Sequence, residues 1–310
     1  MVLAMAGSAW AQEYPNRLVR LVAPFSPGGA TDTLARIIGQ KLNERMGQPV
    51  MVENRVGAGG NIGADLVAKS APDGYTLLLG GVPQAISVTL YSRLPYDLQK
   101  DLAAVAEIAT FPSMIVLHPS LPVKSVKELI TLAKAWPGEL NFGSAGNGSP
   151  NHLALELFKT MANVKMVHIP YKGSGQVIGD LLAGQVQLAS MGFPVATPHV
   201  KSGRLRAIAV TGSERSPLLP AIPTVSEAGL PGFDVTSWYG VFAPASTARD
   251  IVVKLNTEVG NVMANPEVRQ RLSGMGAEPS IKTPEQFTQY VREEVAKWAK
   301  VVKDSGAKLD

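Results

Sequence analysis

Short apolar segments alternate with amphipathic ones along almost the whole chain, and this alternation constrains the fold more than any other feature. Leu18–Phe25 is rich in leucine and valine and predicts a buried strand. After a glycine-rich turn, apolar residues recur at helical spacing from Leu34 to Leu42 and predict a helix that runs to Met46. Continuous apolar strands separated by helices are typical of a parallel sheet covered on both faces. The sequence therefore predicts the α/β class.

The same reasoning assigns the rest of the chain. Further strands are expected at Pro49–Glu53, Tyr75–Leu79, Phe111–His118, Leu140–Phe142, Lys165–Tyr171, Val186–Ser190, Leu205–Val210 and Trp238–Ala243. Further helices are expected over Ala64–Ser70, Ser125–Ala135, Asn151–Met161, Gln176–Ala183, Arg249–Met263 and Pro284–Val302. The proline-rich segment Ser216–Pro231 is expected to be irregular.

Length suggests two domains, because 310 residues are about twice the usual size of one. We expect the first lobe to comprise residues 12–110 and 234–310, with residues 111–233 inserted as the second lobe. A cleft between two such lobes is the usual place for a small ligand.

Composition excludes several functional classes. Cysteine is absent, which removes disulfides, thiolate metal sites and a cysteine nucleophile. The formal net charge is +4, from 29 basic and 25 acidic residues, but no Lys/Arg run exceeds two, so no nucleic-acid footprint is present. The longest uncharged stretch, Leu181–Val200, contains glutamines and prolines and is unsuited to a membrane span.

The first residues predict export. Val2–Ala11 is small and apolar, and Ala9-Trp10-Ala11 matches the pattern that precedes signal-peptidase cleavage. We therefore expect residues 1–11 to be the remnant of a signal peptide, with cleavage near Ala11 and Gln12 as the first mature residue. The alternative is an apolar N-terminal tail.

The first candidate site is the turn before the first long helix, Pro24–Asp32. Ser26 is a good N-cap and Pro27 suits the first helical position. Gly28 and Gly29 have no side chains to cover the backbone N–H groups. An anion suits such a helix start, and Asp32 is expected to bond backbone or water. The alternative is a plain strand–helix turn.

The second candidate, Gly143–His152, repeats this chemistry in the other lobe. The predicted strand Leu140–Phe142 leads into this turn. Ser149 is expected to cap the next helix and Pro150 to be its first residue. Two such turns in different lobes could point into one cleft. The alternative is that both serve packing only.

Other loops are weaker candidates. Gly80-Gly81 follows a strand, and Lys172-Gly173 follows another, although a lysine there is more often solvated. Met191–Phe193 could supply an apolar wall, or belong to the core. Gly57–Gly63 reads G-x-G-x-x-x-G, one residue off the dinucleotide fingerprint, which keeps a nicotinamide-dependent enzyme open as an alternative. The histidines lack metal-site spacing and no nucleophile-elbow or P-loop motif occurs, so no catalytic or metal residue is expected.

Longer motifs resemble one family. The matching segments are Tyr14-Pro15, Val22–Asp32 (VAPFSPGGATD), Val52–Asn54, Gly57–Gly63, Pro72–Tyr75 (PDGY), Gly143–Leu153 (GSAGNGSPNHL), Pro170–Gly173, Leu182–Gln185, Pro220–Thr224, Glu227–Gly229 and Trp238–Phe242 (WYGVF). In these segments the chain is similar to the periplasmic receptors of tripartite tricarboxylate transporters, also called Bug receptors. The resemblance covers essentially the whole mature chain.

The resemblance implies a two-lobed periplasmic-binding-protein type II (Venus flytrap) fold, each lobe a mostly parallel sheet flanked by helices. It implies a monomeric, non-enzymatic receptor without cofactor, which binds a small organic acid and meets membrane transporter subunits. A sensory receptor for the same ligands is an alternative. One ligand carboxylate would lie between the two loops, held by backbone groups and two waters. The implied ligand-binding residues are Phe25, Ser26, Gly29, Ala30, Thr31, Asp32, Gly80, Gly81, Ser144, Ala145, Gly146, Ser149, Lys172, Gly173, Met191 and Phe193.

Overall fold

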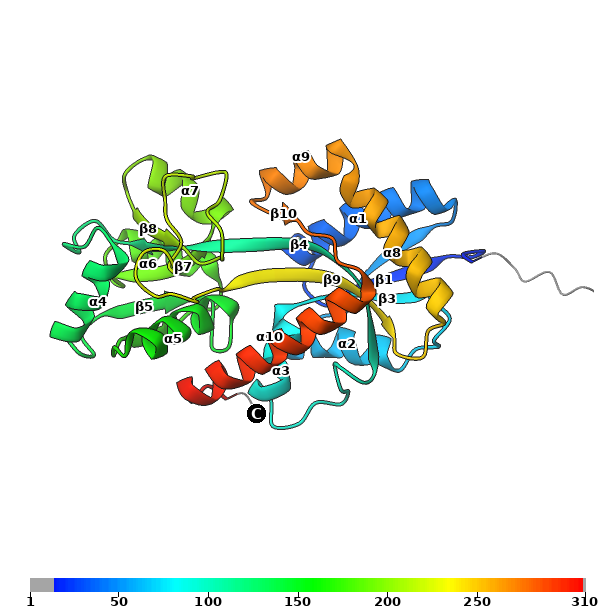
Figure 1. The fold of residues 1–310 in the computed structure, drawn as a ribbon, viewed down its shortest axis with the longest axis horizontal. Coiled ribbons are helices and arrows are strands. Elements are labelled where there is room, and N and C mark those ends of the chain that lie inside the picture. Colours follow the sequence, from blue (N-terminus) through cyan, green and yellow to red (C-terminus); the bar gives the residue numbers. More distant parts are fainter. Residues whose placement is uncertain (1–13, 309–310) are drawn as a thin grey trace, which may run out of the picture.

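The computed structural model describes residues 14–308 and arranges them as two lobes linked by two long strands (Figure 1). The predicted signal segment, residues 1–11, lies outside the described residues. The linking strands are β4 (Leu102–Leu117) and β9 (Thr236–Pro244), which pair antiparallel from Leu102 to Pro112 of β4. The predicted lobe boundaries, at 110/111 and 233/234, fall in or beside these two strands.

Lobe one contains the parallel strands β1 (Val19–Ala23), β2 (Val50–Asn54) and β3 (Thr76–Gly81), in the order β2-β1-β3. β9 follows β3 in antiparallel orientation, and β4 follows β9. The short strand β10 (Glu278–Pro279) pairs with β4. The helices of this lobe are α1 (Ala30–Met46), α2 (Asn61–Ala68), α3 (Val82–Leu90), α8 (Arg249–Ala264), α9 (Pro266–Gly274) and α10 (Pro284–Ser305), with the 3-10 turn η1 (Ala58–Gly60) before α2.

Lobe two repeats this plan with β5 (Asn141–Ser144) between the parallel strands β6 (Val167–Pro170) and β7 (Leu188–Gly192). The second half of β4 pairs antiparallel with β7 and with β8 (Arg206–Val210). Its helices are α4 (Val126–Ala135), α5 (Pro150–Ala162), α6 (Ser174–Leu182) and α7 (Phe193–Lys201). In each lobe all strands but one long linking strand run in the same direction, apart from the two-residue β10. The predicted α/β class with mostly parallel sheets is therefore confirmed.

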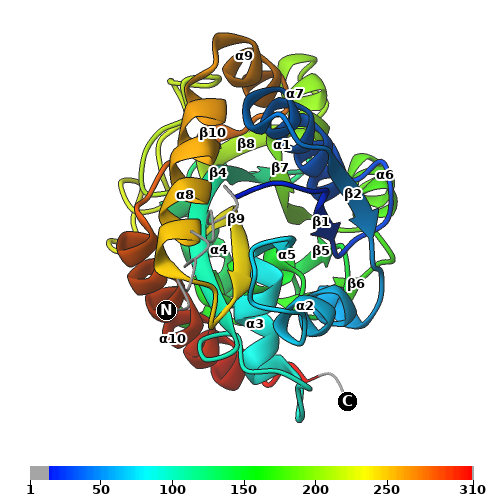
Figure 2. The same cartoon turned by 90° about the vertical axis from the view of Figure 1, so that its right-hand side faces the viewer.

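Both faces of the lobe-one sheet are covered, as its apolar strands predict. Along β3, Leu77 and Leu79 pack on one face with residues of α1 and α8. Leu78, between them, packs on the other face with residues of α2, α3 and α10. Figure 2 shows these two groups of helices on opposite sides of the molecule. α10 also packs against α5 of lobe two, so a helix as well as two strands joins the lobes.

Several elements differ from the prediction. β4 begins at Leu102, nine residues before the expected start. The prediction missed the first half of this strand because it is alanine-rich and carries the buried Glu107, and neither feature is typical of a strand. Hydrogen bonds from Ser280 and Lys282 to the Glu107 carboxylate offset the cost of burying it in the strand. The helices α3, α7 and α9 were not predicted, and α3 follows β3 with no intervening loop.

Candidate functional site

Loop one, residues 24–29, connects β1 to α1 and is exposed from Ser26 to Gly29. The prediction that Ser26 caps α1 and that Pro27 opens it is wrong. Gly29 is the N-cap and Ala30 is the first helical residue. The reason is the turn that precedes the helix: the Gly29 N–H donates to the Ser26 carbonyl at 3.4 Å, and Gly28 adopts a φ of +83°, which favours glycine.

This arrangement leaves the start of α1 open. Gly29 has no side chain, so no side-chain hydrogen bond caps the first turn of α1. The first N–H groups of any α-helix lack a partner within the helix and carry a partial positive charge. Gly29 and Ala30 are exposed, so the helix start faces solvent at these two residues, where an anion would be favoured.

Asp32, in the first turn of α1, holds loop one from beneath. Its buried carboxylate accepts hydrogen bonds from the Gly28 N–H at 2.9 Å, from Asn54 Nδ2 at 3.0 Å and from Arg36 Nε at 3.0 Å. Asn54 Nδ2 also donates to the Phe25 carbonyl at 2.9 Å. These donors, Arg36 above all, lower the pKa of Asp32 to about 2. Its predicted bond to the backbone is confirmed.

Loop two, residues 145–149, connects β5 to α5 as predicted. Ser149 is the N-cap of α5, its hydroxyl accepts a hydrogen bond from the His152 N–H at 3.2 Å, and Pro150 is the first helical residue. The Ser149 N–H donates to the Gly146 carbonyl at 3.2 Å. Both loops therefore use a backbone hydrogen bond to hold their shape, but only loop two has a side-chain cap on its helix. Ala145, Gly146 and Ser149 are half-exposed at its surface.

A stack of rings lies below loop two. The rings of His152 and His168 are nearly parallel, with centroids 3.8 Å apart, and Phe142 stacks on His168 at 4.9 Å. His152 Nδ1 accepts a hydrogen bond from the Gly148 N–H at 3.1 Å. Ser144 Oγ lies 2.6 Å from His168 Nε2 and donates to the Gly146 carbonyl at 3.1 Å. The buried Ser144 thus supports loop two rather than offering a free hydroxyl.

The surroundings of His168 favour its neutral form. Burial, and then the neighbouring His152, lower the pKa of His168 to about 4. Glu156, buried on α5, lies 3.6 Å from His152 Nε2 and accepts a hydrogen bond from Lys159 at 2.7 Å. Sequence reasoning included His152 at the end of the second candidate segment but gave neither its ring nor His168 a role, because the two rings meet only when β6 lies beside β5.

Residues of the linking strands lie beside the first turn of α1. Tyr239 of β9 is hydrogen-bonded to Thr31 of α1, and burial raises its pKa. Phe111 of β4 packs edge-on against Tyr239, with ring centroids 5.2 Å apart. Gly81 of β3 is the register partner of Tyr239. The structure therefore brings the predicted residues Thr31 and Gly81 together around Tyr239, which the sequence analysis missed.

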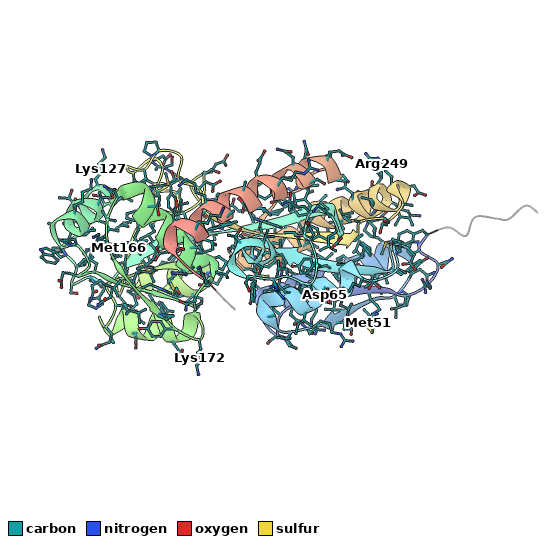
Figure 3. All side chains as sticks on the ribbon, turned by 90° about the horizontal axis from the view of Figure 1, so that it is seen from below. Met51, Asp65, Lys127, Met166, Lys172 and Arg249 are labelled. Carbon is teal, nitrogen blue, oxygen red and sulfur yellow. The ribbon has the colours of Figure 1, made fainter. Side chains whose placement is uncertain are left out.

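Other predicted residues occupy different environments. Gly80 and Gly81 end β3 instead of forming a loop; a Cβ atom at Gly81 would lie 2.5 Å from the Trp238 carbonyl oxygen, so close strand packing requires glycine there. Met191 and Phe193 are buried in the lobe-two core, so the expected wall is part of that core. Lys172 is exposed and projects outward in Figure 3, next to Gly173, the N-cap of α6.

The glycine-rich segment that resembled a dinucleotide fingerprint has a packing role. It forms η1 and the first turn of α2. A Cβ atom at Gly63 would lie 2.9 Å from Pro24 Cβ and 3.1 Å from the Arg55 carbonyl oxygen. Glycine there lets α2 lie directly against loop one. The predicted pattern is thus explained by close packing.

We also searched residues 14–308 for cavities, metal-binding clusters and membrane-spanning helices. Two cavities of about 520 and 400 Å³ are lined by residues outside both loops. No group of three or more histidine, aspartate or glutamate side chains there could hold a metal ion. In the same part of the chain, every helix is too short or too polar to span a bilayer.

Comparison with known proteins identifies the family. The model of the tripartite tricarboxylate transporter family receptor matches residues 34–307. The chain belongs to this receptor family. Protein BugT of Bordetella pertussis is 41% identical over 307 residues, which cover 98% of this chain and 94% of BugT.

Solved structures of related receptors have the same fold. Rpa4515 of R. palustris, solved with adipate, is 40% identical and superimposes with a TM-score of 0.80 over 95% of this chain and 99% of its own. MatC of Rhodopseudomonas palustris, solved with bound malate, is 36% identical with a TM-score of 0.77 over 93% of this chain and 100% of its own. The periplasmic binding protein BugD is 33% identical, with a TM-score of 0.77 over 95% and 99%. The predicted family and fold are therefore confirmed.

Proposed function

We propose that this receptor captures a small organic carboxylate between its two lobes and delivers it to the membrane subunits of a tripartite transporter. The observation that carries the proposal is the open start of α1, where an exposed Gly29 leaves the first-turn N–H groups without a side-chain cap. A carboxylate suits such a helix start. Two relatives, at 40% and 36% identity, were solved with adipate and with malate, both dicarboxylates.

The two loops would contribute differently. Loop one and the start of α1 would donate backbone hydrogen bonds to the carboxylate. Asp32, in the first turn of α1, is engaged with Arg36 and Asn54. Loop two, held by Ser149 and the His152–His168 stack, would close over it with its half-exposed residues Ala145 and Gly146. Bridging waters would complete the contacts.

Backbone recognition can supply the required affinity. A micromolar site needs about −8 kcal/mol. Hydrogen bonds to a charged group contribute about 1.5–3 kcal/mol each, and a helix terminus about 0.3–2 kcal/mol. Four such bonds and two helix starts reach that order before the cost of association, so closure that excludes water would have to strengthen them. No arginine within either loop is required.

The remaining features of the proposal concern location and chemistry. We place the protein in the periplasm, exported by the apolar segment Val2–Ala11 and cleaved near Ala11. There it would act as a monomer and without a catalysed reaction. Its ligand set would be the residues named from sequence in both loops, with Tyr239 and Phe111 added beside the first turn of α1.

The test is a binding screen of ligand-stripped protein by calorimetry and thermal shift, against a panel of mono-, di- and tricarboxylates. Gly29→Leu is the informative variant. Its Cβ would be 3.5 Å from the Ser26 carbonyl oxygen, an ordinary contact, so the side chain would block the start of α1 without strain. Gly179→Leu, on α6 with open space around it, is the matched control.

We expect at least one acid to raise the melting temperature of the wild type and of Gly179→Leu. The same acid should leave the melting temperature of Gly29→Leu unchanged. A protein that responds to no acid would contradict the proposal. If a nicotinamide dinucleotide quenched the tryptophan fluorescence, the result would favour the alternative that the Gly57–Gly63 pattern left open, a nicotinamide-dependent enzyme.

A further inference from the structure

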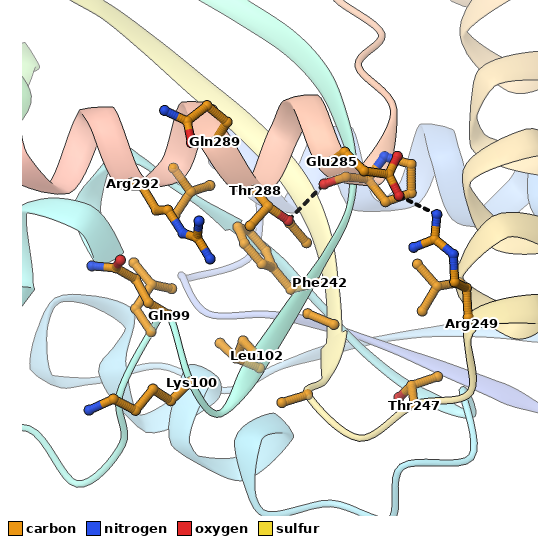
Figure 4. Close-up of a pocket in the computed structure, with 17 residues that line it drawn as sticks. Gln99, Lys100, Leu102, Phe242, Thr247, Arg249, Glu285, Thr288, Gln289 and Arg292 are labelled. Carbon is orange, nitrogen blue, oxygen red and sulfur yellow. Dashed lines mark hydrogen bonds and ion pairs between the residues drawn. The ribbon is translucent and has the colours of Figure 1, made fainter.

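The larger of the two cavities described above lies in lobe one, away from both loops. Its volume is about 520 Å³, and it is lined by residues at the start of β4, at the end of β9 and in the N-terminal halves of α8 and α10 (Figure 4). Pockets of about 300–1,000 Å³ are typical of small-molecule sites. We call it the α8–α10 cavity and define it by Gln99, Leu102, Phe242, Val252, Val291 and Arg292.

The floor of the α8–α10 cavity is apolar. Leu102 and Phe242 come from β4 and β9, which are paired here, and Val252 and Val291 face them from α8 and α10. None of these four side chains is more than 7% exposed. The floor is therefore apolar and suited to an aliphatic or aromatic group.

The rim is cationic, and one of its cations is free. Lys100 is paired with Asp97 and Arg249 with Glu285. Arg292 is exposed and has no ion pair or hydrogen bond within the described part of the chain. Figure 4 shows its guanidinium group directed toward the space between Gln99 and Phe242. A guanidinium group binds a carboxylate through two parallel hydrogen bonds.

We propose that the α8–α10 cavity is a second ligand site, which takes an amphipathic monocarboxylate. The carboxylate would bind Arg292 and the amide of Gln99, and the apolar body would lie on Leu102 and Phe242. A dicarboxylate is excluded, because its second charge would have to be buried on the apolar floor. This chemistry differs from that of the two loops, where backbone groups would bind the anion. The site belongs entirely to lobe one and so does not depend on the proposed function.

The test uses octanoate, hexanoate and suberate as probes in isothermal titration calorimetry. Octanoate and suberate have the same length, but suberate carries a second carboxylate. We expect octanoate to bind more tightly than hexanoate by about fourfold per methylene group. Suberate should show no binding that depends on Arg292.

Two variants address the site. Arg292→Gln should weaken octanoate binding by about tenfold or more, through loss of the charged hydrogen bonds. Ala245→Trp adds a bulky group at an exposed residue of the cavity wall and should block binding. Arg204→Gln, at an exposed arginine of lobe two, is the matched control and should leave binding unchanged.

Gly29→Leu separates this site from loop one. Octanoate should bind this variant as tightly as it binds the wild type. Absence of octanoate binding, binding that Arg292→Gln leaves intact, or binding that is lost in Gly29→Leu would each overturn the inference. A separate failure of the organic-acid screen would bear only on the proposed function.

Discussion

Protonation of His168 should destabilise the protein below neutral pH. In the folded state the pKa of His168 is lowered from 6.5 to about 4, chiefly by burial, with a contribution from the neighbouring His152 and a smaller one from Lys159, while Glu156 opposes them. In the unfolded chain no such burial exists. Between these two pKa values the unfolded state binds a proton that the folded state excludes. The free energy of unfolding therefore has its full value above pH 6.5 and decreases as the pH falls from 6.5 to about 4.

The magnitude follows from the two pKa values. Each pKa unit corresponds to about 1.36 kcal/mol, so the whole interval is worth about 3 kcal/mol. Between pH 7 and pH 5 the loss should be about 2 kcal/mol. Because Gly148 donates to His152 and Ser144 contacts His168, the same protonation should also disturb loop two and weaken ligand binding.

His168→Phe tests the reasoning, since phenylalanine keeps the stacked ring but cannot be protonated. Urea unfolding at pH 7, 6 and 5 measures the free energy of unfolding, and an NMR titration follows the imidazole directly. The variant should be less stable than the wild type at pH 7, having lost the contact with Ser144, but should lose about 2 kcal/mol less on going to pH 5.

Ser144→Ala is the control, because it removes the contact with His168 while the imidazole still titrates. It should lower stability at pH 7 and keep most of the pH dependence. The reasoning is refuted if His168→Phe and the wild type lose equal stability between pH 7 and pH 5, or if the NMR titration places the pKa of His168 near 6.5.

Three further predictions concern the loops and the sheet. Asp32→Asn should reduce the free energy of unfolding by about 2 kcal/mol at pH 7, because it removes a buried charge that accepts hydrogen bonds from Gly28, Asn54 and Arg36. The loss is not larger because the pair with the exposed Arg36 is partly screened. In urea titrations the difference from wild type should shrink as the pH falls from 4 through about 2. Ser149→Ala should cost about 1 kcal/mol through loss of the N-cap of α5, seen as a lower melting temperature by circular dichroism. Gly240→Ala would place its Cβ against the Phe287 ring and should destabilise the protein by about 1–3 kcal/mol, whereas a wild-type melting curve would show that the ring can move aside.

Local patterns predicted most elements because strand and helix periodicity is written in neighbouring residues. The helix over α5 was predicted with its cap at Ser149 and its first residue at Pro150, since the serine hydroxyl and the fixed φ of proline both act within the first turn of the helix. The cap of α1 was predicted at Ser26 and is formed by Gly29 instead. The turn at Gly28, held by the carboxylate of Asp32, moves the start of the helix, and that contact is not visible as a sequence pattern.

The sequence by itself determined the α/β class, the order of most strands and helices, the family and the two glycine- and serine-rich loops. Tertiary structure alone decided that an alanine-rich segment with a buried Glu107 forms half of β4, that His152 and His168 stack beneath loop two, and that α8 and α10 line a cavity. The physical reason is the sequence separation over which each interaction acts. Periodicity and capping act over a few residues, whereas burial, ion pairing and ring stacking join residues that are distant in the chain until the sheet assembles.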